Sequence, residues 1–182
     1  MNLLFHLFLT HFIADFPLQP NKLVQYKKKT FKGVFLHCLI HLAVLIIILI
    51  PFLHLKSVWI GIGVIFVTHN IIDQSKITLD KKNPRLTLPL YLLDQILHLL
   101  VIAIVAYYIG VVTPNLPEWM SFYTDRSIVL YILILVLVTY FYDVTRYFIR
   151  SRKKKIKYKR DYMMMLRNVF IVSIAFALYW LS

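Results

Sequence analysis

The sequence predicts an all-α fold: a polytopic integral membrane bundle of about six membrane helices. Of its 182 residues, 60% are hydrophobic and 16% are charged. A soluble globular domain has about 45–50% apolar and about 25% charged residues. The mean hydropathy is +0.71, and the apolar residues form long runs. About 20 such residues in a helix cross the hydrocarbon core of a bilayer, so these runs predict a membrane protein.

Six apolar segments follow one another along the chain. The first, residues 2–16, has 15 residues, and a helix of that length extends only about 22 Å. It is therefore expected to be a short or half-inserted helix that ends before Pro17. The other five are predicted membrane helices, and they cover residues 33–53, 57–72, 89–112, 127–149 and 162–181.

The basic residues lie mostly in three connecting segments. The chain has 21 Lys and Arg against 8 Asp and Glu, a formal net charge of +13. All but two of these cations fall within residues 22–32, 76–85 and 146–167, which share one side of the membrane if the helices alternate. The positive-inside rule makes that side cytoplasmic. We therefore expect a multi-pass protein of the bacterial cytoplasmic (inner) membrane.

The strongest basic run, residues 150–160, carries eight cations in eleven residues. Its predicted partners are membrane lipids, because anionic headgroups attract such a run. Nucleic acid is not expected as a partner, since neither interleaved stacking aromatics nor a known nucleic-acid-binding fold accompanies the cations. The sequence gives no indication of the oligomeric state.

Two parts of the chain resemble each other. HFIAD (residues 11–15) matches HNIID (69–73), and FLHCLIHLAV (35–44) matches LLDQILHLLV (92–101). The offsets are 58 and 57 residues, which predicts a parallel repeat of a two-helix hairpin. The predicted organisation has four parts: hairpins at 1–55 and 56–112, which form a four-helix membrane domain, an outer loop at 113–126, and a C-terminal helical pair with a cytoplasmic polybasic loop at 127–182.

Four pairs of ionisable residues occur at i, i+4 spacing within the apolar segments: His11/Asp15, His37/His41, His69/Asp73 and Asp94/His98. This spacing places both members of a pair on one helix face. An ionisable residue inside a membrane segment is costly and indicates a function. Because the helices alternate in direction, all four pairs are expected at one depth near the cytoplasmic ends.

These eight residues are the predicted metal ligands. A single His–Asp pair is more often a buried hydrogen-bonded pair, but inward-facing His and carboxylates on four helices build dinuclear sites in bundle proteins. Two divalent cations would balance three aspartates and one hydroxide, and the ligand types suit zinc, iron or manganese. Asp73 or Asp94 is a candidate base, and Lys76, one turn beyond Asp73, could hold an anionic group.

Four ordered blocks, HFIADFPLQ, FLHCLIH, HNIIDQSK and LLDQILH, resemble an uncharacterised bacterial inner-membrane family described as a domain of unknown function. The resemblance extends over about residues 6–108. It implies the importance of the eight predicted ligands, of Lys76, and of Gln19 and Gln95. The short His/Asp-rich helices are also loosely similar to membrane-bound metal-dependent hydrolases.

These observations favour a membrane-embedded metal-dependent hydrolase with a dinuclear His/Asp site near the cytoplasmic face. Its expected substrate is anionic, such as a phosphate-bearing lipid. Whether the protein is an enzyme stays open at this point. The alternatives are a divalent-metal transporter or metal-binding membrane protein, because HNIID is similar to the His-Asn-x-x-Asp element of metal-importing families, and then a di-iron or haem redox protein.

Overall fold

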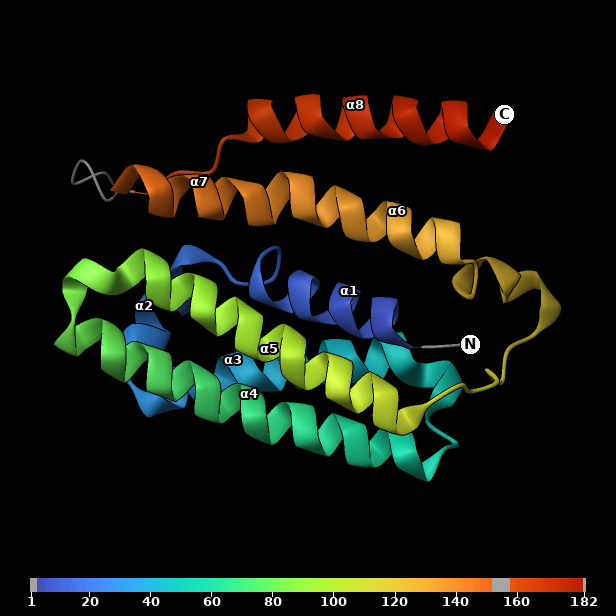
Figure 1. Ribbon diagram of the computed structural model, residues 1–182, viewed down its shortest axis with the longest axis horizontal. Helices are drawn as coiled ribbons and strands as arrows, with labels where there is room; N and C mark the ends of the chain where they lie inside the picture. Colours follow the sequence, from blue (N-terminus) through green and yellow to red (C-terminus); the bar gives the residue numbers. More distant parts are fainter. Residues whose placement is uncertain (1–2, 152–157, 182) are drawn as a thin grey trace.

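The computed structural model describes residues 3–151 and 158–181, and over these residues it is helical without a β-strand. Most of the helices lie roughly side by side along the long axis of the molecule (Figure 1). The all-α prediction is confirmed. The α-helices are α1 (Leu4–Asp15), α2 (Asn21–Lys29), α3 (Phe31–Leu49), α4 (Lys56–Lys82), α5 (Thr87–Ile109), α6 (Arg126–Val136), α7 (Tyr142–Ser151) and α8 (Tyr162–Leu181).

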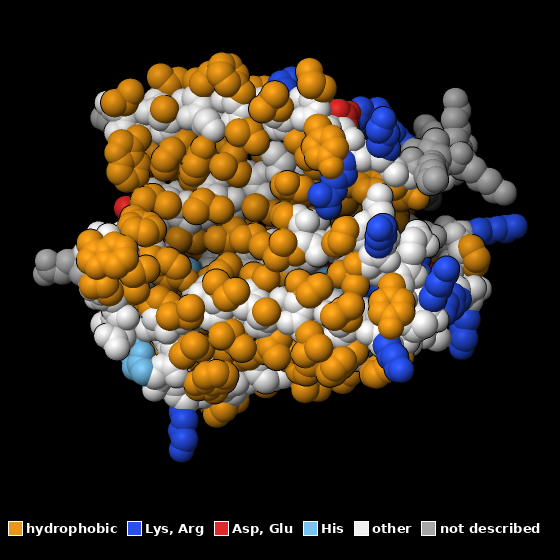
Figure 2. Space-filling model, turned by 180° about the vertical axis from the view of Figure 1, so that it is seen from behind, with side chains coloured by type: hydrophobic (Ala, Val, Ile, Leu, Met, Phe, Trp, Pro, Cys, Tyr) orange, Lys and Arg blue, Asp and Glu red, His pale blue; other side chains and the backbone are white. Residues whose placement is uncertain are grey.

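Helix α2, the turn from α4 to α5 and the end of α7 all lie at one end of the bundle, and both chain termini lie at the other (Figure 1). We call the first the basic end, because the described parts of the three cation-rich segments lie there. Lys and Arg gather at this end of the surface, while apolar side chains cover most of its length (Figure 2). Residues 152–157 of the polybasic run lie outside the described residues.

Four helical stretches among the described residues are long and apolar enough to cross a membrane: Phe31–Phe52, Pro84–Ile109, Arg126–Ser151 and Tyr162–Leu181. Large side chains such as Ile47 (63% exposed) and Ile96 (61% exposed) point outward from them. Soluble monomers rarely expose such extensive apolar surface, so the protein is best described as a membrane protein.

Six crossings are not confirmed. Helix α1 has 12 residues, which gives a length of about 18 Å. Helix α4 contains the predicted segment 57–72 but continues to Lys82, and its second half carries several charged residues. Six therefore stays a prediction, and length and composition support four.

The segment 22–32, predicted as a connecting loop, contains helix α2. Pro17 and Pro20 separate it from α1, because proline cannot donate the backbone hydrogen bond that a continuous helix needs. The equivalent segment after Asp73 has no proline before Pro84, so α4 runs on without a break. The two halves thus differ in the connection between their helices, and the internal repeat stays a prediction.

An apolar core fills the space between α1, α3, α4 and α5 towards the end that holds the termini. Its side chains are at most 8% exposed. Because burying one such side chain contributes about 1.5–3 kcal/mol, this core holds the four helices together on one side of the candidate site. Its largest members include Leu3, Leu7, Leu45, Leu49, Phe52, Val58, Ile62, Ile102 and Val105.

The C-terminal helices pack against α1 and α5. The stretch Arg126–Ser151 is one long helix with a π-helical turn at Leu137–Phe141. The ring of Phe141 packs edge-on against Phe16 at 5.3 Å between centroids. Arg160 Nη2 donates a hydrogen bond of 2.9 Å to the carbonyl oxygen of Phe16. These contacts join the last third of the chain to the basic end of α1.

Helix α2 lies against α3 at Gly33. A Cβ atom at this position would lie 2.6 Å from the backbone nitrogen of Lys27 and would also overlap the backbone of Tyr26. Such backbone contacts cannot relax by a side-chain rotation. Glycine is therefore required for α2 to approach α3 this closely.

Gly33→Ala is expected to lower the stability of the protein by about 1–3 kcal/mol, the usual effect of overpacking, and to displace α2. Gly63→Ala is the matched control. Its Cβ would meet nothing within 4 Å, and alanine is the better helix former by up to about 1 kcal/mol. Thermal unfolding in detergent should show a lower midpoint for Gly33→Ala only. Equal midpoints would contradict the close approach of α2.

Candidate metal centre

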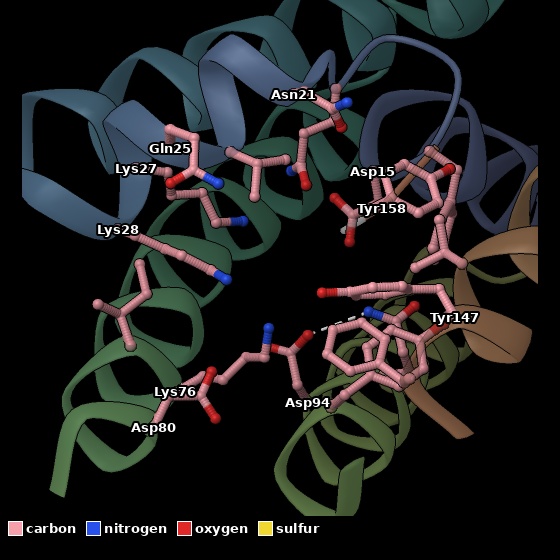
Figure 3. A pocket seen from close by; sticks show the side chains of 18 of the residues that line it. Asp15, Asn21, Gln25, Lys27, Lys28, Lys76, Asp80, Asp94, Tyr147 and Tyr158 are labelled. Atoms are coloured by element: carbon pink, nitrogen blue, oxygen red, sulfur yellow. Dashed lines mark hydrogen bonds between the residues drawn. The ribbon is translucent and has the colours of Figure 1, made fainter. Parts of the chain in front are cut away.

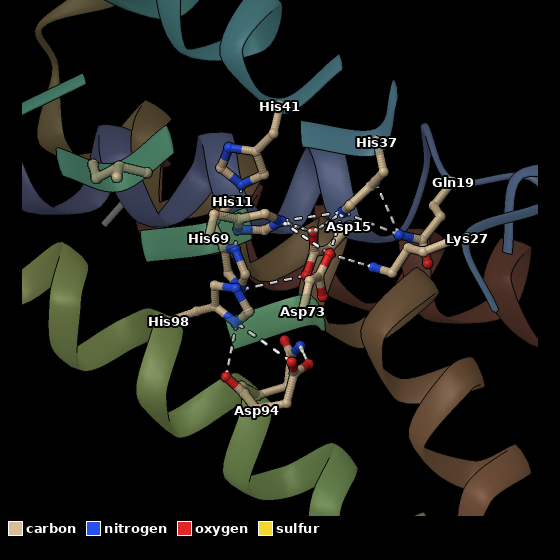
Figure 4. A network of polar contacts seen from close by, with 12 residues as sticks. His11, Asp15, Gln19, Lys27, His37, His41, His69, Asp73, Asp94 and His98 are labelled. Atoms are coloured by element: carbon tan, nitrogen blue, oxygen red, sulfur yellow. Dashed lines mark hydrogen bonds and ion pairs between the residues drawn. The ribbon is translucent and has the colours of Figure 1, made fainter. Parts of the chain in front are cut away.

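The structure brings all eight predicted ligands into one cluster inside the bundle (Figure 4). Helices α1, α3, α4 and α5 each contribute one i, i+4 pair, and every side chain of the set is at most 9% exposed. We call this set the His/Asp cluster. Its members are His11, Asp15, His37, His41, His69, Asp73, Asp94 and His98.

Four of the imidazoles form a layer on the side of the apolar core. The ring centroids of His41 and His69, and of His69 and His98, are 4.2 Å apart. His11 stacks on His98 at 5.0 Å, and its Nδ1 lies 3.4 Å from His41 Nε2. Four imidazoles at these separations cannot all carry a positive charge without strong repulsion, so the layer offers mainly neutral nitrogen donors.

His37 and two carboxylates lie next to this layer, towards the basic end. His37 Nε2 is 3.1 Å from Asp15 Oδ1 and 3.2 Å from His69 Nε2. It is also 3.6 Å from Asp73 Oδ2, which is equally far from His69 Nε2. This arrangement directs imidazole nitrogens and carboxylate oxygens towards the same points, where one metal ion could contact several of them.

The donor atoms form three overlapping groups, each with all its donor atoms within 4.8 Å of one another. His69 belongs to the first and second groups, and Asp73 to the second and third. Nitrogen and carboxylate donors at such separations suit divalent transition metals. The groups are His11, Asp15, His41 and His69; His37, His69 and Asp73; and Asp73, Asp94 and His98.

The hydrogen bonding of His98 leaves a nitrogen free for a ligand. Its Nδ1 donates to the backbone carbonyl oxygen of Asp94 at 2.8 Å. Because that carbonyl can only accept, Nε2 of the neutral ring carries the lone pair. The buried cluster nitrogens without a hydrogen-bond partner among the described residues include His98 Nε2, His69 Nδ1 and His11 Nε2. Buried polar atoms normally have partners, so these three fit a missing ligand such as a metal ion.

Lys27 is a member of the site that the sequence analysis missed. Its Nζ lies 2.6 Å from Asp73 Oδ2, and both side chains are buried. Burial alone would lower the pKa of Lys27, but the carboxylates, Asp73 first, raise it above the ordinary value. The ammonium therefore stays charged. The one sequence signal was the position of Lys27 four residues after Leu23, since these two form the buried face of α2.

Lys27 changes the charge balance that predicted two divalent cations. Three aspartates and one lysine give the cluster a net charge of −2 when the imidazoles are neutral. One divalent cation would neutralise it, whereas two would leave +2 for a dianionic ligand. An ion pair buried this deeply is costly unless it is well matched, so the residues present fit at least one divalent metal ion.

Among the described residues, the two glutamines implied by the family resemblance are hydrogen-bonded to the cluster, whereas the lysine that it implies is not. Gln19 lies beyond the end of α1, yet its Nε2 is 3.1 Å from His37 Nδ1. Gln95 Nε2 donates to Asp94 Oδ2 at 3.0 Å. Lys76, the predicted anion-holding residue, has no ion pair with the cluster among the described residues, and it lies on a cavity wall. Lys22, at the start of α2, is exposed and does not line that cavity.

A cavity of about 670 Å³ opens beside the cluster at the basic end (Figure 3). Asp15 and Asp94 form part of its wall, so the cavity gives access to two of the predicted ligands. Helix α2 and the second half of α4 line one side, and α5, α7 and the segment before α8 line the other. Its volume lies in the range of about 300–1,000 Å³ that is usual for small-ligand sites.

The fold and the site define a membrane protein of helical type that carries a buried His/Asp cluster beside an open cavity. The chain belongs to the family described as "Protein of unknown function (DUF3307)", whose match covers residues 3–125. The whole cluster lies within this range, and α6 begins directly after it. No curated protein and no solved structure matches the chain.

Proposed function

We propose that this protein is a membrane-embedded, metal-dependent hydrolase that acts on an anionic phosphate ester. The observation that carries the proposal is the contact between cavity and cluster. Asp15 and Asp94 belong both to the metal-ligand groups and to the cavity wall. A ligand in the cavity would therefore lie next to the metal ions. The positive-inside rule assigns the basic end, and with it the cavity, to the cytoplasmic face of a bacterial inner membrane.

Of the two candidate bases, Asp94 is favoured over Asp73. Asp94 lines the cavity, whereas Asp73 does not and is paired with Lys27. Gln95 holds Asp94 Oδ2 by a hydrogen bond, and Oδ1 has no hydrogen-bond partner among the described residues. Oδ1, which lies 3.8 Å from His98 Nδ1, would accept a proton from a water molecule that enters from the cavity, as a general base does.

A divalent cation held by the cluster would supply Lewis acidity that polarises the phosphate and favours attack by water. Hydrolysis would then proceed by attack of water on phosphorus. The water oxygen bonds to phosphorus while its proton passes to Asp94 Oδ1, the P–O ester bond breaks, and the released alcohol takes a proton from solvent in the cavity. Lys76 lies on the same wall and would hold the anionic substrate.

The packing of the bundle favours this function over metal transport. A transport site must be reached from both sides of the membrane, usually at its midplane. Here the apolar core lies on the far side of the imidazole layer, and residues such as Leu49, Phe52 and Val58 are fully buried there. Access is through the cavity at the basic end.

Elemental analysis of the purified protein should find one or two divalent transition-metal ions per chain. Chelation should abolish the hydrolysis of phosphate esters, and adding the metal back should restore it. His69→Ala should lose metal and activity together, whereas His54→Ala, which removes an exposed histidine outside the cluster, should keep both. Metal uptake into proteoliposomes without hydrolysis would instead support a transporter, and a protein that binds no divalent metal even when the ions are supplied would contradict both.

A further inference from the structure

Three lysines point into the cavity from two different helices. Lys27 and Lys28 come from α2 and Lys76 from α4, and Figure 3 shows their amino groups directed towards the same space. We call them the lysine triad. The amino group of Lys76 lies beside Asp94 (Figure 3), and that of Lys27 is ion-paired with Asp73 of the cluster. The triad is therefore placed between solvent and the candidate metal centre.

The three ammonium groups are close enough to repel one another. Partial burial, and after it the ammonium of Lys76, hold the pKa of Lys28 below its ordinary value, and Lys27 adds to the effect. The carboxylate of Asp80 offsets only part of this repulsion. The repulsion between Lys28 and Lys76 on one side of the cavity is relieved when an anion binds between them.

The opposite wall of the cavity is aromatic and comes mostly from another part of the chain. Phe148 stacks on Tyr91 with 4.3 Å between centroids, and Tyr158 contacts Tyr147 edge-on at 5.2 Å. We call these four residues the aromatic wall. Tyr91 is further held by a hydrogen bond of 2.9 Å between its hydroxyl and Thr145 Oγ1. Three of the four residues lie beyond residue 125, outside the part of the chain that defines the family.

We infer that the cavity is the binding site for a phosphomonoester, with the phosphate between the lysine triad and the His/Asp cluster and the esterified group against the aromatic wall. This inference rests on the proposed function, because a divalent cation would offset the net charge of −2 on the cluster and so strengthen the binding of an anion. Lysines bind phosphate as point charges. Lys28 and Lys76, whose charges are not part of the cluster's balance, favour the dianion of a monoester over the single charge of a diester.

The two sides of the cavity then have separate roles. The lysine triad, within the family segment, recognises the phosphate that every substrate shares. The aromatic wall, which comes mostly from the C-terminal part of the chain, selects the group attached to the phosphate, because ring faces bind apolar surface while tyrosine hydroxyls bind polar atoms. The source of the phosphomonoester can be a lipid headgroup or a soluble metabolite, and both share this chemistry.

Binding to the full-length protein in detergent, with its metal content measured in parallel, tests the inference. The probes are inorganic phosphate and glycerol 3-phosphate by titration calorimetry, and nanodiscs with phosphatidic acid or phosphatidylglycerol by native mass spectrometry. Lys28→Met/Lys76→Met should weaken phosphate binding by about tenfold or more, the usual effect of losing hydrogen bonds to charged groups. Lys28→Arg/Lys76→Arg should keep most of it. Lys81→Met, on the same helix but exposed and away from the cavity, should bind like the wild type.

Tyr147→Ala tests the second role. It should leave the affinity for inorganic phosphate unchanged and alter the preference between glycerol 3-phosphate and phosphatidic acid. An equal loss for all three probes would overturn the division between the two walls. Binding of phosphatidic acid alone, or of glycerol 3-phosphate alone, identifies the source of the ligand and supports the inference.

The failure of this inference is distinguishable from the failure of the proposed function. If the protein holds metal and Lys28→Met/Lys76→Met binds phosphate as tightly as the wild type, the phosphate site is overturned and the proposed function is not. Equal binding of phosphatidylglycerol and phosphatidic acid would overturn the monoester class. Lysine-dependent phosphate binding by a protein that holds no metal would overturn the metal-dependent hydrolase and leave the anion site standing.

Discussion

Asp73→Asn is expected to abolish metal binding at two of the three ligand groups and to destabilise the protein by about 3–5 kcal/mol, the usual cost of leaving one member of a buried ion pair without its partner. Lys27 Nζ lies 2.6 Å from Asp73 Oδ2, so the substitution leaves a buried ammonium without its closest carboxylate. Thermal unfolding in detergent and elemental analysis measure the two effects on the same sample.

The double variant Asp73→Asn/Lys27→Met separates the two roles of Asp73. Removing both charges should restore most of the stability, because no unpaired ion remains, while the metal content stays low. If the double variant regained metal, Asp73 would be only a structural partner of Lys27. If the single variant were as stable as the wild type, the buried ion pair would be absent in solution.

Asp94→Asn should reduce the turnover of a phosphate ester by about 10²–10⁴-fold, the range expected when a general base is lost. Asparagine keeps the size of the side chain but cannot accept the proton from water. The group formed by His11, Asp15, His41 and His69 does not include Asp94, so at least one metal ion should stay bound.

Asp161→Asn is the charge-matched control for Asp94→Asn. Asp161 accepts a hydrogen bond from the backbone nitrogen of Met164 at the start of α8, where asparagine serves equally well. Its ion pair with Arg146 is partly exposed, and such pairs contribute little to stability. Its turnover should match that of the wild type. Full activity in Asp94→Asn, with metal bound, would exclude Asp94 as the base and leave the proton acceptor to be found elsewhere in the cavity.

The eight residues of the cluster were predictable from the sequence because the signals that identify them, their spacing and their apolar surroundings, lie within single helices. An i, i+4 spacing places two side chains on the same helix face. An ionisable residue in an apolar segment is costly to place in a membrane and therefore indicates a function. Alternation of the helices then places the four pairs at one depth. No knowledge of how the helices pack was needed to expect His69 near His41, and the structure brings these rings to 4.2 Å.

Lys27 was not predictable in this way, because its position depends on tertiary packing. It lies in a run of lysines that is typical of a cytoplasmic loop, and only its spacing of four residues from Leu23 distinguishes it from Lys28 or Lys29. Only the close approach of α2 to α3 at Gly33 directs its side chain inward. For the same reason, residues 21–29 were predicted as part of a connecting segment, although they form a helix.

The far wall of the cavity was missed for a related reason. The sequence of the C-terminal segment predicts two apolar helices and a basic loop, and it contains no motif that indicates a binding site. Tyr147, Phe148 and Arg160 reach the site only because α7 and the segment before α8 pack against the basic end of α1. The sequence assigned this region to a separate helical pair, whereas the structure makes it part of the candidate binding site.

The Lys27–Asp73 ion pair has a consequence for the order of events during biosynthesis. Many metal sites cannot form until the ion is present, because their ligands repel one another in its absence, and folding then waits for the metal. Here a tethered ammonium offsets one carboxylate inside the bundle. The chain can therefore insert into the membrane and fold before it meets an ion. Loading becomes a later step through the cavity, and the metal-free protein should be an isolable, folded species.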